Sequence, residues 1–207
     1  MAGKPSTIAG LLTEPYREYW AELGQFIHYF SDIERSMQSL LRTVAGVSDP
    51  LGAALFSGIK VDGAMSFINR ACESTGRGDA KARLEPVFQQ LGIINGIRNN
   101  IVHWGAREDG DELIVTNHYL ASTPDRVQRF PISARDLHLM IIDLIKIRMH
   151  IGWEEMTLKG EAVNPQLAET LFSQILSAAW RYKQPQRSSP KAQRLPKTPK
   201  RSRPREA

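Results

Sequence analysis

The fold of this chain depends on one long stretch, Thr13 to Gly46, which reads TEPYREYWAELGQFIHYFSDIERSMQSLLRTVAG. Its large apolar residues recur at spacings of three and four over about seven turns, which is the period of one helix face. The main line comprises Trp20, Leu23, Ile27, Phe30, Met37, Leu41 and Val44, and Phe26, Ile33 and Leu40 flank it. Thr13 is suited to cap this helix and Gly46 to end it. A helix of this length with one apolar face predicts a helical bundle.

The same helical period returns in the segments that follow. Ser48-Asp49-Pro50 predicts the start of a short second helix, and Asp62 predicts the cap of a third helix that runs through Cys72. A fourth helix spans Leu84 to Ile101, with Pro86 either in its first turn or at a kink. Together with the first helix, these segments predict a mainly helical body.

The hydrophobic period changes after the fourth helix. Glu112–Tyr119 and Arg126–Ile132 are rich in β-forming residues and are flanked by turn sequences, which predicts a two-stranded hairpin. Beyond it, Ser133 and Asp136 have the spacing of a capping box and open another long helix. Asn164-Pro165 opens the last predicted helix. The apolar face of that helix carries Leu167, Leu171, Ile175, Ala178 and Tyr182.

The predicted fold class is therefore all-α, an up-down bundle of four main helices plus short helices, with a small β-hairpin insert at about 110–132. The predicted organisation is a flexible leader over 1–12, the bundle over 13–183 and a basic disordered tail over 184–207. The tail holds five prolines and Leu195 as its one large aliphatic residue, so it cannot bury enough apolar surface to offset the entropy of ordering.

Composition excludes several classes of protein. Of the 207 residues, 42% are hydrophobic and 24% are charged, which is enough apolar material for a sizeable core. No run of eighteen apolar residues and no signal peptide is present, so we expect a cytoplasmic protein with no membrane partner. Cys72 is the single cysteine, which excludes an internal disulfide and cysteine-based metal sites.

Other cofactor and metal signatures are also missing from the sequence. No phosphate-binding glycine loop and no G-x-S-x-G elbow occurs. The histidines outside the motif described below show no metal-ligand spacing with carboxylates and are interpreted as surface or groove residues. They are His28, His118, His138 and His150. We expect neither a metal nor a cofactor.

Charge is divided unevenly along the chain. Residues 1–183 hold 19 basic and 21 acidic residues, whereas the tail over 184–207 holds eight basic residues and Glu206. The body is thus close to neutral, with a net charge of −2, and the tail carries +7. A cationic segment of this kind attracts nucleic-acid phosphates through counterion release. The alternative is a solubilising tail without a specific partner.

Two charged residues interrupt the apolar lines of long helices. The spacing of the first helix places Glu34 on the line of Ile27 and Phe30, and that of the fourth helix places Arg98 on the line of Leu91 and Ile94. An inward carboxylate and an inward guanidinium are each costly alone, so we expect the two groups to pair. The pair either fixes the register of the helices or forms part of a functional site.

The string Gly96–Gly105, GIRNNIVHWG, favours the functional interpretation. On an ideal helix Arg98 and His103 lie about 140° apart, with Asn99 between them, so the three can line one groove. An arginine fork beside an imidazole and an amide suits a phosphodiester. Trp104 follows His103 and offers a ring on which a base can stack.

This cluster resembles the motif of the HEPN superfamily (higher-eukaryote and prokaryote nucleotide-binding domains), in which an arginine and a polar residue precede a histidine late on a bundle helix. The resemblance covers roughly residues 15–180, including the acidic position on the first helix. It implies a metal-independent ribonuclease of the toxin–antitoxin, abortive-infection or CRISPR type, active as a homodimer on RNA, with an antitoxin or activator protein as a further partner. Gly105 stands where some bacterial members have tyrosine, so a tyrosine-dependent variant is not expected.

The resemblance implies a role for each residue of the motif. His103 acts as general acid or base, Arg98 stabilises charge on the reacting phosphate, and Asn99 positions an oxygen. Glu34 orients Arg98, and Asn100 supports the site. The alternative is a non-catalytic helical module that binds RNA or protein, in which the Arg98–Glu34 pair is structural and the tail tethers the module to nucleic acid.

Overall fold

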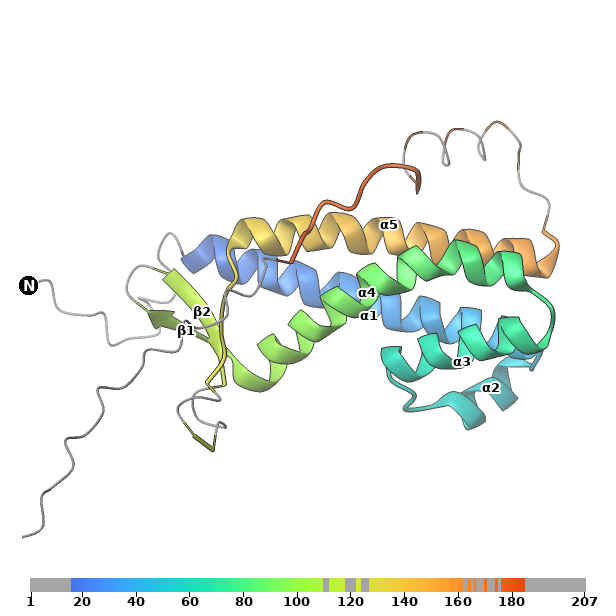
Figure 1. Cartoon of the computed structure of the whole chain (residues 1–207), viewed down its shortest axis with the longest axis horizontal. Helices are drawn as coiled ribbons and strands as arrows, with labels where there is room; N and C mark the ends of the chain where they lie inside the picture. The colour runs from blue at the N-terminus through green and yellow to red at the C-terminus, as the bar shows by residue number, and fades with distance from the viewer. Residues whose placement is uncertain are drawn as a thin grey trace, which may run out of the picture.

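The structure is a computed structural model, and it describes residues 16–109, 112–117, 122–123, 127–161, 164, 166, 170, 174 and 176–184. Within these ranges lie five helices: α1 (Tyr16–Ala45), α2 (Asp49–Phe56), α3 (Val61–Ser74), α4 (Gly78–Trp104) and α5 (Ala134–Lys159). A small antiparallel sheet accompanies them, so the predicted all-α class with a β insert is confirmed (Figure 1). The predicted leader over 1–12 and the tail from residue 185 onward lie outside the described residues.

Helix α1 buries a line that is rotated from the predicted one. Trp20 is 38% exposed, whereas Phe26, Ile33 and Leu40 are fully buried. These three residues are seven apart, and seven residues at 100° each return to within about 20° of the same direction, so they form a nearly straight seam. The core face therefore includes the flanking residues of the prediction as well as part of its main line, namely Phe30, Met37, Leu41 and Val44. Gly46, with φ of +67°, follows the end of the helix.

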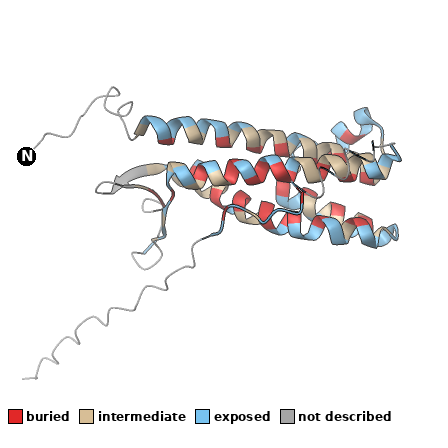
Figure 2. Ribbon diagram, turned by 90° about the horizontal axis from the view of Figure 1, so that it is seen from above, coloured by how far each residue is buried: buried red, intermediate tan, exposed pale blue. Residues whose placement is uncertain are grey.

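The three long helices pack side by side around this seam (Figure 1). Helices α1 and α5 run in the same direction, because Glu22 faces His138 and Ser39 donates to Glu155 at 2.7 Å further along both helices. Helix α4 runs in the opposite direction. Buried residues occupy the faces on which the helices meet (Figure 2). The buried thiol of Cys72 belongs to this core, and burial raises its pKa.

Helices α2 and α3 cover one end of the bundle. The side-chain amide of Gln38 donates to the carbonyls of Phe56 and Ile59, at 3.3 and 3.2 Å, and so ties α1 to the connection between α2 and α3. The prediction that Asp62 caps α3 is wrong, because α3 begins one residue earlier, after Lys60. The carboxylate of Asp62 instead accepts a hydrogen bond from the amide of Asn95 on α4.

The structure tests two local predictions, the position of Pro86 in α4 and the capping of α5. Pro86 lies well inside α4, past its first turn, so the first-turn alternative is wrong. The predicted capping box at the start of α5 is confirmed: Oγ of Ser133 accepts the backbone N–H of Asp136 at 3.1 Å, and the carboxylate of Asp136 accepts that of Ser133 at 2.9 Å. Gly160 ends α5 in the left-handed conformation.

The sheet has three strands, β1 (Ala106–Asp109), β2 (Glu112–Thr116) and β3 (Arg129–Pro131), in that order. The predicted pairing of the second and third is confirmed, with Val115 opposite Phe130. The prediction of two strands is wrong, because β1 also pairs with β2. Its sequence, ARED, has no apolar alternation, and it forms a strand by pairing its backbone with β2. The insert therefore starts at residue 106 rather than about 110.

The last predicted helix lies mostly outside the described residues, which include neither Leu167, Leu171 nor Ile175. Where the chain is described again, residues 177–184 are not helical, so the prediction that the helix reaches Ala178 and Tyr182 is wrong. We call residues 176–183 the strap. It leaves the helical path because its backbone N–H groups bind a buried carboxylate of α5, as described below.

Candidate functional site

Arg98 lies on α4 where this helix passes α1, and three groups surround its guanidinium. Nη2 of Arg98 lies 3.6 Å from Oε1 of Glu34, so the predicted approach of these two residues is confirmed. The guanidinium also lies over the ring of Phe30, 5.2 Å from its centroid, and Nη1 donates to Asn99 at 3.2 Å. The side chains of Arg98 and Glu34 are 28% and 44% exposed. The pair is therefore half-buried at the edge of the bundle rather than enclosed in its core.

The remaining motif residues occupy the last turns of α4. Asn99 and Asn100 are half-buried, and His103 is exposed. Within the described residues no hydrogen bond joins His103 to Arg98 or Asn99, so the structure brings Arg98, Asn99 and Glu34 together and leaves the imidazole open to solvent. Gly105 ends the helix with φ of +69°, a conformation that other residues rarely adopt.

Trp104 packs on the sheet rather than standing free for a base. Its ring stacks on that of Phe130 in β3, with centroids 5.7 Å apart and planes at 22°. Trp104 is half-buried, and this stack connects the end of α4 to the far strand of the sheet. One face of the indole is thus already occupied by Phe130, so the predicted stacking of a base would have to use the other face.

Polar residues outside the predicted motif form a second network between α4, α5 and the strap. The carboxylate of Asp143 is fully buried and accepts three hydrogen bonds, from the amide of Gln90 and from the backbone N–H groups of Arg181 and Tyr182, at 2.8 to 2.9 Å. The sequence contains a sign of this buried carboxylate. Asp143 interrupts the apolar run MIIDLI, just as Arg98 interrupts the apolar line of the fourth helix.

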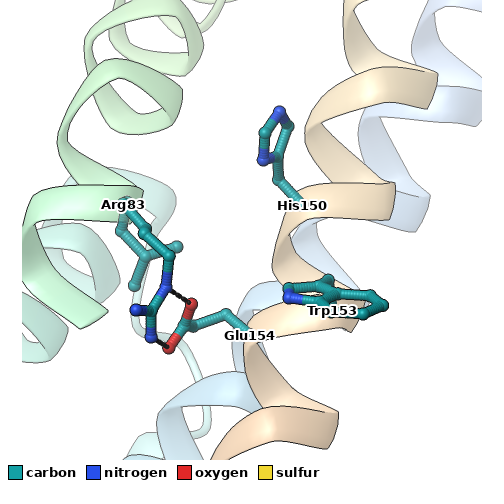
Figure 3. Close-up of a pocket in the computed structure, with 5 residues that line it drawn as sticks. Arg83, His150, Trp153 and Glu154 are labelled. Carbon is teal, nitrogen blue, oxygen red and sulfur yellow. Dashed lines mark hydrogen bonds and ion pairs between the residues drawn. The ribbon is translucent and has the colours of Figure 1, made fainter. Parts of the chain in front are cut away.

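A small cavity of about 90 Å³ lies further along the bundle and is lined by Arg83, Leu84, His150, Trp153 and Glu154 (Figure 3). The guanidinium of Arg83 binds both oxygens of the buried Glu154 carboxylate, each at 2.8 Å. Burial lowers the pKa of His150, and the nearby ammonium of Lys146 lowers it further. Arg83 precedes Arg98 by fifteen residues, about 22 Å along the helix axis, so this cavity is separate from the motif.

Two of the other histidines that were predicted to lie at the surface are exposed in the structure. His28 and His138 are exposed, and His118 lies outside the described residues. Among the residues that the structure describes, no group of three or more His, Cys, Asp or Glu side chains could hold a metal ion. None of the described helices is long and apolar enough to cross a membrane.

No protein-family model, curated protein or solved structure matches this chain. The resemblance to HEPN domains therefore rests on the residues of the motif and on the helical setting described above.

Proposed function

We propose that the protein is a metal-independent RNA endonuclease of the HEPN type. The observation that supports this best is the environment of Arg98, which Glu34 and Phe30 hold in place while leaving part of its guanidinium exposed. His103 follows five residues later on the same helix and is exposed. An oriented guanidinium binds a phosphodiester, and an imidazole exchanges protons near neutral pH.

In the proposed reaction the ribose 2′-oxygen attacks its own phosphorus while a base removes the 2′ proton. The bond from phosphorus to the 5′-oxygen of the next nucleotide breaks, and an acid gives that oxygen a proton. The products are a cyclic 2′,3′-phosphate and a free 5′-hydroxyl. His103 serves as one of these two proton-transfer groups, Arg98 stabilises the charge on the pentacoordinate phosphate, and Asn99 positions an oxygen.

A homodimer completes this proposal. The reaction needs a base and an acid, and each chain contributes one motif histidine, His103. Two motifs that face each other across a two-fold axis would supply both groups. By resemblance, we further propose a role in a toxin–antitoxin or anti-phage defence system, with an antitoxin or activator protein that controls the site.

A second function, a non-catalytic module that binds RNA or protein, is supported by a specific observation. The contacts of Arg98 with Glu34 and Phe30 join α1 to α4, so they account for an arginine at this position without any ligand. The two functions differ in one measurable respect, which is whether RNA is cut.

The test is incubation of the purified protein with end-labelled RNA, with and without EDTA. We expect cleavage that survives EDTA and downstream fragments that polynucleotide kinase phosphorylates without prior phosphatase treatment, because their 5′ ends are free hydroxyls. His103→Ala should abolish cleavage while the protein stays folded, since this side chain is exposed. His28→Ala and His138→Ala, which alter exposed histidines outside the motif, are the matched controls and should retain activity.

Two results would count against the enzyme. Cleavage that persists in His103→Ala would make the motif coincidental. Absence of cleavage of any RNA, with or without proteins encoded beside this one, would favour the non-catalytic module.

A further inference from the structure

The strap is held on the bundle by a buried carboxylate. Asp143 is fully buried, and its two oxygens accept the backbone N–H groups of Arg181 and Tyr182 at 2.8 and 2.9 Å. The amide of Gln90 bridges the same carboxylate and the carbonyl of Tyr182, at 2.8 and 3.1 Å. A carboxylate that stays buried and loses its donors is costly, so this end of the strap is firmly fixed.

A second set of contacts holds the earlier part of the strap. The ammonium of Lys146 lies over the ring of Trp180, 4.2 Å from its centroid, and donates to the carbonyl of Ala178. The ring of His150 lies 6.0 Å from that of Trp180. Leu176 is buried. These contacts use side chains of α5 that do not face α1, so the strap covers a different side of α5 from the core seam.

The order of the contacts gives the strap a direction. Ala178 lies at Lys146 and Tyr182 lies at Asp143, so the strap runs antiparallel to α5. It therefore points toward the end of the bundle where α5 begins, α4 ends and the sheet lies (Figure 1). At its last contact with α4 it touches Gln90, which is eight residues, or about 12 Å of helix, before Arg98.

We propose that the strap is an anchor that directs the basic tail, residues 184–207, toward the Arg98–His103 end of the bundle, where the tail binds the phosphates of the RNA strand that flanks the bound site. This inference rests on the proposed function, because it names the substrate as an RNA that extends beyond the nucleotides at the motif. The tail adds affinity for that extension and takes no part in the proton transfers.

Charge and reach support this arrangement. The tail carries +7 and the rest of the chain −2, so nearly all the net attraction for a polyanion lies in the tail. The first basic residues, Arg187 and Lys191, follow the anchored Tyr182 by five and nine residues. An extended chain covers about 3.3 Å per residue, so five residues exceed the 12 Å that separate Gln90 from Arg98 along the helix. Anchoring raises the effective concentration of these cations at the motif.

The test measures binding of fluorescent single-stranded RNAs of 8 and 24 nucleotides by anisotropy over a range of salt concentrations. All proteins carry His103→Ala, so the RNA stays intact and the result does not depend on cleavage. Replacing the eight basic residues of the tail with glutamine should weaken binding of the 24-mer at least about tenfold. It should also lower the salt slope by on the order of 3, as expected for four or five phosphate contacts on a single strand. The 8-mer should lose much less affinity.

Two variants test the anchor separately from the charge. A flexible insertion of about twenty Gly and Ser residues between Gln184 and Pro185 leaves the strap in place but moves the tail away, and we expect a loss of affinity for the 24-mer of about threefold with an unchanged salt slope. Asp143→Ala combined with Trp180→Ala removes both sets of contacts, so it should release the strap and cause a similar loss. Trypsin reports the release, because Arg181 and Lys183 lie within the strap and should resist cleavage only while it is docked.

Either of two outcomes would overturn the inference. If neutralising the tail changes neither the affinity for the 24-mer nor its salt slope, the tail serves solubility or an acidic protein partner instead. If the insertion variant binds the 24-mer as tightly as its parent, the tail binds RNA without direction from the strap. Both outcomes are distinct from failure of the proposed enzyme, which appears as absence of cleavage by the protein with His103 intact.

Discussion

The guanidinium of Arg98 lies 3.6 Å from the carboxylate of Glu34, and both side chains keep part of their surface exposed at the edge of the bundle. Ion pairs of this exposure add little to stability, typically about 0 to 1 kcal/mol. Their effect on geometry is larger, because the carboxylate and the ring of Phe30 together restrict where the guanidinium can lie. Nε of Arg98 is also buried and has no hydrogen-bond partner among the described residues. The pair is thus better suited to orient an arginine than to stabilise the fold.

Substitution of either partner should separate orientation from charge. Arg98→Ala should abolish RNA cleavage and lower the free energy of unfolding by only about 1 kcal/mol, because the pair is solvent-screened. Glu34→Gln should leave stability nearly unchanged and lower the cleavage rate by less than Arg98→Ala does, since the guanidinium remains but is held less well. Cleavage rates and urea denaturation curves measure the two effects. Arg35→Ala removes an exposed arginine of α1 that pairs with Asp32 and is the control. Wild-type cleavage by Arg98→Ala would contradict the proposed role.

The proposed dimer can be tested at Val102. This side chain is 51% exposed, lies one turn after Arg98 and precedes His103, so it would be covered if two motifs faced each other. We expect a dimer that buries on the order of 1,200 Å² or more, and we expect Val102→Asp to convert it to a folded monomer without cleavage activity. Light scattering after size exclusion gives the mass. Leu55→Asp, at an exposed residue of α2, is the control and should leave the dimer intact. A wild-type protein that is strictly monomeric would remove the two-histidine arrangement.

Two C-terminal truncations, one that keeps the strap and one that removes it, should have very different effects on the melting temperature. Removing residues 185–207 should leave the melting temperature nearly unchanged, because the strap and its contacts with Asp143 remain. Removing 176–207 should lower it by at least about 5 °C, since the buried carboxylate loses two N–H donors and the contacts of Leu176 and Tyr182 are lost. Thermal denaturation followed by circular dichroism measures both. A large drop in the first deletion would mean that the tail itself docks on the bundle.

Stability should fall when the pH drops below neutrality. Burial lowers the pKa of His150 from its usual 6.5, and the ammonium of Lys146 lowers it further. The ion pair of Arg83 and Glu154 lines the same cavity as His150. The unfolded chain therefore binds a proton at a higher pH than the folded chain does. The contribution of His150 is fully present above about pH 6.5 and is lost as the pH falls through the window below it, at a slope of up to about 1.4 kcal/mol per pH unit.

Urea denaturation at pH 7.5, 6.5 and 5.5 tests this dependence. His150→Gln should flatten the decline between pH 6.5 and 5.5. His28→Gln, which alters an exposed histidine, should behave like the wild type. An identical decline in His150→Gln and wild type would assign the titration to another group.

Local pattern was enough to predict the helices α1 to α5 and the contact at the motif. The capping box of Ser133 and Asp136 was predictable because its two hydrogen bonds join residues three positions apart. The pairing of Arg98 with Glu34 was predictable because each charge interrupts an apolar line, and two such interruptions on neighbouring helices are most easily satisfied by each other.

Contacts between distant segments were not predictable in this way. Strand β1 has no apolar alternation and exists because β2 offers it a backbone partner. The apolar residues before Tyr182 have helical spacing, but the chain is not helical at that residue because Asp143, some forty positions earlier, binds its N–H group.

The sequence alone determined that the chain forms long amphipathic helices with a small β insert, and it placed Arg98, Asn99 and His103 on one helix, because periodicity and caps are properties of neighbouring residues. Only the tertiary structure decided which residues of α1 form the centre of the core, that Trp104 stacks on Phe130 and that the strap binds Asp143. These features depend on how helices that are far apart in the chain cross and fill space together, and that is a property of the packed whole rather than of any one segment.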